Sequence, residues 1–93
     1  MKEIVLDTET TGLSPASDKI IEIACIEIEN HLPTGKKFHA FVNPGMDISE
    51  GAYQTHGITK EFLNDKPKFN EIAQAFVDFI KDYRLVIHNA DFD

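Results

Sequence analysis

The chain has 93 residues and a formal net charge of −7, from 9 Lys and Arg against 16 Asp and Glu, and this balance argues against a protein that coats nucleic acid. With 42% hydrophobic residues it predicts one globular domain, and its single cysteine, Cys25, excludes an intramolecular disulfide or a cysteine-rich zinc site. No apolar run approaches the roughly 20 residues that span a bilayer or forms a signal peptide, so we expect a soluble cytoplasmic protein with no membrane partner.

Three segments in the first half of the chain are predicted to be strands. Residues 3–6 are apolar and rich in β-branched side chains, which is typical of a buried strand. A long strand is predicted over residues 19–29, because apolar and acidic residues alternate along its second half. Residues 30–35 predict a hairpin connection to a third strand over 37–42. The short connections favour an antiparallel meander.

The second half of the chain is predicted to be helical up to a final short strand. Ser49 is a candidate N-cap for a short helix that ends at the His56-Gly57 pair, and Thr59 is a candidate cap for another. After Pro67, apolar side chains recur at the spacing of one helix face: Phe69, Ile72, Ala73, Phe76, Ile80 and Tyr83. Residues 85–88 predict a buried strand. Because a helix leads into this strand, we expect it to pair parallel to an earlier one in a mixed α/β sheet.

An acidic pair follows the first predicted strand. Asp7 and Glu9 are two residues apart, so in extended structure their side chains face the same way, with Cα atoms roughly 6.5–7 Å apart. Two such carboxylates can hold one hard cation or flank two, as Mg²⁺ sites do. Asp93 follows the last apolar strand and would reach the same point if the two strands are neighbours. Taken alone, the pair is weak evidence for a metal site and is more typical of solvated acids at the start of a turn.

Two motifs resemble those of a known enzyme family. Residues 4–12, Ile-Val-Leu-Asp-Thr-Glu-Thr-Thr-Gly, resemble the first motif of the DEDD 3′–5′ exonucleases, and residues 86–93, Val-Ile-His-Asn-Ala-Asp-Phe-Asp, resemble their second. Residues 19–23, 55–58 and 61–67 are most similar to family members that proofread for bacterial DNA polymerase III. The resemblance covers essentially the whole chain. Two motifs in the family order, with a matching middle, are more specific than either motif alone.

The resemblance implies an α/β, ribonuclease H-like mixed sheet, with residues 1–93 as the N-terminal portion of a single exonuclease domain that is incomplete at its C-terminus. Asp7, Glu9 and Asp93 align with family ligands for two divalent cations, Mg²⁺ or Mn²⁺, and bridging both cations is the natural task for Asp7. Two cations activate the attacking water and stabilise the departing 3′ oxygen. The implied partners are a DNA 3′ end and the catalytic and other core subunits of DNA polymerase III.

The resemblance also implies substrate-binding residues. The breaker-rich segment 10–15 predicts a loop, and four of its residues would cradle the 3′-terminal nucleotide: Thr10, Thr11, Gly12 and Leu13. Gly12 would let the backbone approach the substrate, and Leu13 would pack on a base. His56 matches a position near the substrate phosphate or sugar, and Asn89 either binds substrate or holds its turn. The structural alternatives are a plain turn for residues 10–13 and, for His56, a histidine that only ends a helix. Glu22 is polar in mid-strand, and we assign it no role.

The sequence leaves two alternatives to a DNA exonuclease open. In the family a third motif supplies a histidine as general base and a fourth aspartate, and we assign neither here. We therefore expect this chain to be part of a longer exonuclease and to be inactive alone. The alternatives are a related exonuclease that trims RNA, or a catalytically incomplete protein that binds metal or polymerase.

Overall fold

The computed structural model describes residues 2–12, 14 and 16–87. Its elements in chain order are strands β1 (Lys2–Thr10), β2 (Ile20–Glu29) and β3 (Leu32–Phe41), helices α1 (Glu50–His56), α2 (Lys60–Leu63) and α3 (Phe69–Ile80), and strand β4 (Arg84–Ile87). This is the predicted order of strands and helices. None of the helices in the described part of the chain is long and apolar enough to cross a membrane.

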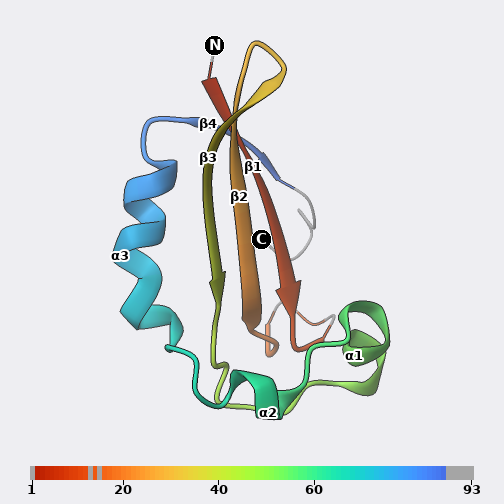
Figure 1. Cartoon of the computed structure of the whole chain (residues 1–93). Coiled ribbons are helices and arrows are strands. Elements are labelled where there is room, and N and C mark those ends of the chain that lie inside the picture. The colour runs from red at the N-terminus through yellow and green to blue at the C-terminus, as the bar shows by residue number, and fades with distance from the viewer. Residues whose placement is uncertain (1, 13, 15, 88–93) are drawn as a thin grey trace.

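The four strands form one mixed sheet in the order β3-β2-β1-β4 (Figure 1). β2 runs antiparallel to both β1 and β3, whereas β4 runs parallel to β1, with Leu85 opposite Ile4. The parallel pairing follows from the connection through α3, which returns the chain to the end of the sheet where β1 begins. The predicted mixed sheet, including the parallel last strand, is confirmed.

The first hairpin is tighter than the sequence predicts. Only Asn30 and His31 form the turn, and both have positive φ, 53° and 71°, as a two-residue type I′ turn requires. The predicted connection over 30–35 is therefore wrong in its extent, because Pro33 and Gly35 lie inside β3 instead of in the turn. β3 tolerates them because it pairs with a single neighbour among the described strands, and the register shifts between Ile26 and Ile28.

β1 and β4 also differ from their predicted bounds. β1 continues to Thr10 because its polar end pairs with β2 as far as Thr10 opposite Ile20, so backbone pairing extends the strand beyond its apolar stretch. β4 begins at Arg84, one residue early, and His88 lies outside the described residues. The prediction that this strand is buried is wrong for the described part of the chain, because β4 lies at the edge of the sheet and leaves Val86 and Ile87 exposed. The acidic residues of the first motif are thus held in regular sheet and not in a loop.

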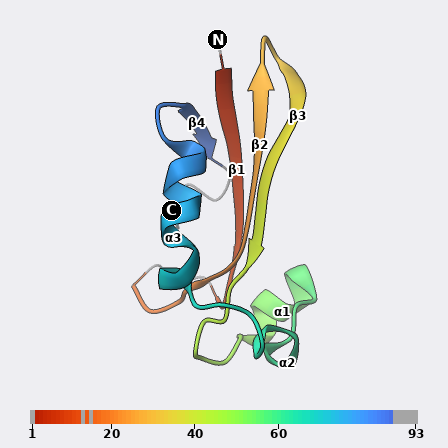
Figure 2. The same cartoon turned by 60° about the vertical axis from the view of Figure 1, so that its left-hand side comes forward.

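The short helices begin at the predicted caps. The Ser49 side chain accepts a hydrogen bond from the Ala52 N–H at 3.1 Å, and the Thr59 side chain accepts one from the Phe62 N–H at 3.1 Å. Gly57 ends α1 with a φ of 70°. In both views α1 and α2 sit together at the end of the sheet where β1 finishes (Figures 1 and 2).

The third helix runs along one face of the sheet (Figure 2). Buried side chains of β1 and β2 form the core there, and α3 packs Ile72, Phe76, Phe79 and Ile80 against it. The Phe38 ring of β3 lies 5.9 Å from that of Phe76 and 5.8 Å from that of Phe79, measured between centroids. The predicted stripe is confirmed for Ile72, Phe76 and Ile80, and Phe79 joins them. Phe69 is 42% exposed at the start of the helix, and Tyr83 packs on the core from beyond the end of α3 at Ile80.

One carboxylate is buried on the same face as α3. Glu27 is only 3% exposed; the Thr34 hydroxyl donates to its Oε1 at 2.8 Å, and the Tyr83 hydroxyl donates to its Oε2. These two hydrogen bonds, that of Tyr83 foremost, hold the pKa of Glu27 below its ordinary value. The network therefore links Thr34 on β3, and Tyr83 between α3 and β4, to Glu27 on β2.

Candidate active site

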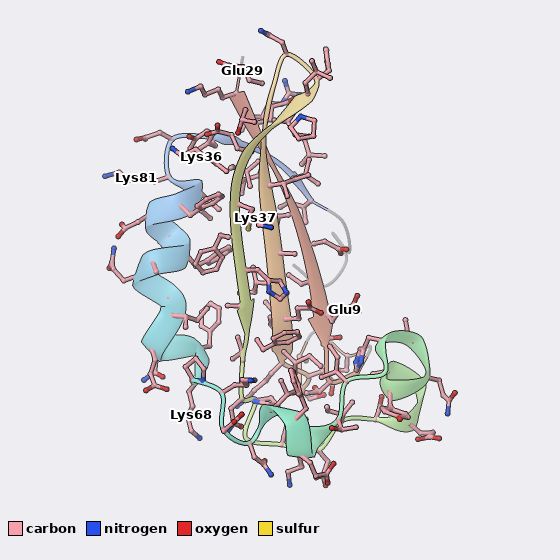
Figure 3. The ribbon with its side chains drawn as sticks, in the orientation of Figure 1. Glu9, Glu29, Lys36, Lys37, Lys68 and Lys81 are labelled. Atoms are coloured by element: carbon pink, nitrogen blue, oxygen red, sulfur yellow. The ribbon has the colours of Figure 1, made fainter. Side chains whose placement is uncertain are left out.

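Asp7 and Glu9 lie on the face of β1 that is turned away from the apolar core. Ile4 and Leu6 are buried against the core, and the alternation of the strand places both carboxylates on the opposite side, where each is half-buried. Glu9 lies near the end of β1, away from the end of the molecule that carries Glu29, Lys36 and Lys81 (Figure 3). The shared face that the two-residue spacing predicts is therefore present.

The environment of Glu9 disfavours its negative charge. Burial is the main cause that raises the pKa of Glu9, the charge of Asp7 adds to it, and Glu22 contributes further, while His56 acts in the opposite direction. A bound cation would relieve the repulsion between these carboxylates. Carboxylate oxygens suit a hard cation such as Mg²⁺ or Mn²⁺. The chemistry of Asp7 and Glu9 is therefore compatible with the predicted metal site.

Glu22 is the cross-strand neighbour of Glu9 in the β1–β2 ladder. Its Oε2 lies 2.6 Å from Nε2 of His39 on β3, so three strands contribute polar side chains to this face. Neither residue has a role predicted from the sequence. Glu22 is brought beside Glu9 by the register between β1 and β2, which no local sequence signal displays.

The predicted third ligand, Asp93, lies outside the described residues, as does Asn89. Within the part of the chain that is described, no three His, Cys, Asp or Glu side chains group closely enough to hold a metal ion. β4 places Ile87 opposite Leu6, one residue before Asp7, so the second motif continues from a strand that is paired with the first. The strands of both motifs are therefore neighbours, as the prediction required.

The loop after β1 is folded tightly against the protein. The Thr10 hydroxyl donates to the Gly12 carbonyl at 2.6 Å. Thr11 is fully buried, and its hydroxyl donates to Asp18 Oδ1 at 2.7 Å, so its side chain serves the protein interior. Leu13 lies outside the described residues. Of the four predicted cradle residues, the structure thus places three in one ordered turn beside Glu9.

His56 joins the end of α1 to the end of β1. Its Nδ1 accepts a hydrogen bond from the Ile58 N–H at 3.0 Å, so the proton of the neutral ring lies on Nε2, which donates to the Thr10 carbonyl at 3.1 Å. Both ring nitrogens are therefore engaged by backbone. This arrangement fixes the position of the Thr10 carbonyl, directly after Glu9.

The chain matches the exonuclease family model RNase_T over residues 4–93, and it belongs to this family. The class that the fold and the acidic pair define is thus an exonuclease domain. Among curated relatives it is 52% identical over 94 residues to the DNA polymerase III subunit epsilon of Rickettsia felis, and 48% identical over 97 residues to that of Buchnera aphidicola subsp. Acyrthosiphon pisum. These alignments cover 100% and 99% of the chain but 41% of each relative, so the chain spans about two fifths of their length.

Solved structures of exonucleases have the same fold. Exonuclease X in complex with 5′ overhanging duplex DNA superposes with a TM-score of 0.77 and is 30% identical, over 97% of this chain and 50% of that one. A structure of exonuclease I gives a TM-score of 0.79 at 21% identity, over 92% of this chain and 20% of its own, and this likeness shows the fold alone. The predicted ribonuclease H-like fold is confirmed.

Proposed function

We propose that the protein containing this chain is a 3′–5′ exonuclease that removes nucleotides from DNA 3′ ends, and that it proofreads during replication. The observation that carries the proposal is the Asp7–Glu9 pair, held on one face at the end of β1 in an exonuclease fold. The epsilon subunits among its relatives support proofreading, with the catalytic and other core subunits of DNA polymerase III as partners. Residues 1–93 would form the N-terminal portion of a single exonuclease domain.

The cofactors we propose are two divalent cations, Mg²⁺ or Mn²⁺, held by Asp7, Glu9 and Asp93. Such cations lower the pKa of the attacking water and stabilise the departing 3′ oxygen when they are bound. The fit is supported by the donor set, which is all oxygen. The pKa of Glu9 is raised first by burial and then by the charge of Asp7, so a cation at this place would favour the ionised carboxylate.

The chain's own residues would position the DNA end. The turn formed by Thr10, Thr11 and Gly12 lies directly beyond Glu9, and the Nε2 proton of His56 holds its first carbonyl in place. We propose that this turn, with His56, Leu13 and Asn89, forms the site of the 3′-terminal nucleotide, and that the fully buried Thr11 shapes the turn from within instead of touching the nucleotide. No residue is proposed as general base.

Replacing Asp7 by Ala in the whole natural protein tests the proposal. The substitution should lower the rate of nucleotide release from a labelled DNA 3′ end by more than about 10²-fold, because it removes one of the three carboxylates proposed to hold the cations. Glu3→Gln is the matched control, since Glu3 lies on the same face of β1 but pairs with Arg84, with Oε2 3.7 Å from Nε. Its activity should stay within about twofold of the wild type.

Three outcomes would contradict the proposal in different ways. Unchanged turnover in Asp7→Ala would remove the acidic pair from catalysis. Faster release from RNA than from DNA 3′ ends would favour the RNA-trimming alternative. Cation or polymerase binding by the whole protein without any hydrolysis would favour the incomplete binding protein.

A further inference from the structure

Asp18 lies between β1 and β2, outside both sequence motifs, yet its carboxylate reaches back to the turn beyond Glu9. Oδ1 accepts a hydrogen bond from the Thr11 hydroxyl at 2.7 Å, and Oδ2 accepts one from the Ser14 N–H at 3.0 Å. The Asp18 N–H in turn donates to the Ser14 carbonyl at 2.8 Å. One half-buried side chain thus holds two points of the loop that leaves β1.

Thr11 also forms hydrogen bonds with the residues that precede β2 and α1. Its hydroxyl accepts from the Lys19 N–H at 3.0 Å, and its own N–H donates to the Lys19 carbonyl at 2.9 Å, which joins the loop to the start of β2. Its carbonyl accepts from the N–H of Ser49, the N-cap of α1, at 2.8 Å. Because Thr11 is fully buried, these bonds are shielded from water and therefore count for more.

The Asp18 carboxylate also occupies the space in which a side chain at position 12 would lie. A Cβ atom built on Gly12 would be 2.4 Å from Oδ2 and 2.7 Å from Cγ of Asp18. The φ of Gly12 is not positive, so its backbone conformation does not itself demand glycine. The resemblance to the exonucleases implies that this glycine lets the substrate approach closely, whereas the structure places the Asp18 carboxylate against it.

We propose that Asp18 is a positioning residue of this exonuclease. It fixes the shape of the turn over Thr10, Thr11 and Gly12 in which the 3′-terminal nucleotide would lie, and position 12 is glycine in order to admit the Asp18 carboxylate. The inference rests on the proposed function, because it assigns the turn to the binding of the DNA end. It adds a residue that lies outside both motifs.

A double-mutant cycle in the whole natural protein tests this inference. Gly12→Ala and Asp18→Ala should each raise KM for a DNA 3′ end by about tenfold or more, with a smaller change in kcat, because each distorts the turn and leaves Asp7 and Glu9 in place. The double variant should be no worse than Asp18→Ala, because removal of the carboxylate leaves room for the added methyl group. If the cost of Gly12→Ala persists undiminished in that background, the substrate and not Asp18 requires the glycine, and the inference is wrong.

Asp18→Asn provides a rescue that distinguishes positioning from loss of charge. Its amide oxygen can accept from the Ser14 N–H while its NH₂ donates to the Thr11 hydroxyl, whose proton can turn to Met46 Sδ, 3.6 Å away. KM should then stay within about threefold of the wild type. A KM as high as that of Asp18→Ala would overturn the hydrogen-bonding account. Asp18→Ser takes the place of Asp18→Ala in the cycle if the latter does not fold.

The outcomes also separate this inference from the proposed function. If the wild type releases nucleotides and Asp7→Ala does not, the exonuclease assignment stands whatever happens at position 18. Unchanged KM in both Asp18→Ala and Gly12→Ala would then overturn the positioning role alone. A wild type without activity on 3′ ends would overturn the proposed function. The melting temperatures of the same variants would still test the role of Asp18: non-additive losses would show that Asp18 requires the glycine, and additive losses would show that it does not.

Discussion

The carboxylate of Glu27 is the most thoroughly buried acidic group of the described chain, and its charge depends on two hydroxyl donors. Its pKa is lowered first by Tyr83 and then by Thr34. Because the pKa is lower in the folded than in the unfolded state, this network stabilises the fold fully above the ordinary value of 4.5. The stabilisation is lost as the pH falls through the folded value.

Replacing Tyr83 by Phe should therefore lower the melting temperature in a pH-dependent way. At about pH 7 the loss should be roughly 5 °C, because a buried carboxylate loses a hydroxyl donor. The gap from the wild type should narrow as the pH falls below 4.5 and Glu27 becomes protonated in both proteins. Thermal melts followed by circular dichroism, from about pH 7 down into this acidic range, measure the gap. Tyr53→Phe, a change at a tyrosine that is 40% exposed on α1, is the control, and a gap that is the same at every pH would contradict the account.

Single residues of the site differ in how far the sequence could predict them. Asp7 and Glu9 could be placed on one face because the period of a strand is two residues and both lie in one strand. Asp18 and Glu22 could not be connected with them, since their contacts depend on the return of a loop and on the register between two strands. Local periodicity carries no information on either.

Among the elements, the hairpin between β2 and β3 carries local strain that can be relieved. Asn30 tolerates positive φ, but His31 adopts a φ of 71° with a full side chain. His31→Gly should therefore increase the free energy of unfolding by about 0.5–1 kcal/mol. Urea denaturation measures this change. The nuclease activity should not change, because the turn follows the end of β2 at Glu29, whereas Glu9 pairs with Glu22 near the start of that strand (Figure 3).

The matched control for the hairpin is His31→Ala. It removes the imidazole but keeps the Cβ atom that makes positive φ unfavourable, so it should give no comparable gain. Equal stabilisation by Ala and by Gly would show that the imidazole, and not the backbone conformation, limits the stability of the turn.

The elements themselves followed from caps and periodicity. Ser49, Thr59 and Gly57 mark helix ends through side-chain acceptors and positive φ, which are local properties that a sequence displays. The predicted extent of the hairpin connection is wrong because Pro33 and Gly35 are turn-forming residues that an edge strand also accepts. Which strand lies at an edge is settled only when the sheet has assembled.

For the whole molecule, the two faces of the sheet have different tasks. One face packs α3 on the apolar core, and the other carries Asp7, Glu9 and Glu22. Phe76→Leu should therefore lower the free energy of unfolding by about 1 kcal/mol, through lost packing on Phe38, and leave kcat/KM within about twofold of the wild type. Denaturant titration and steady-state kinetics on the same preparation measure both quantities. A loss of activity as large as that of Asp7→Ala would contradict the separation of the two faces.

The most direct test of the central claim follows the products of a DNA strand labelled at its 5′ end, with the whole natural protein. In Mg²⁺ the account predicts a ladder of labelled strands that shorten one nucleotide at a time from the 3′ end. Chelation of the metal should stop the ladder, Asp7→Ala should slow it by more than about 10²-fold, and Glu3→Gln should leave it intact. Immediate release of the labelled 5′ nucleotide, or a ladder that persists in Asp7→Ala, would contradict a 3′–5′ exonuclease built on the acidic pair of β1.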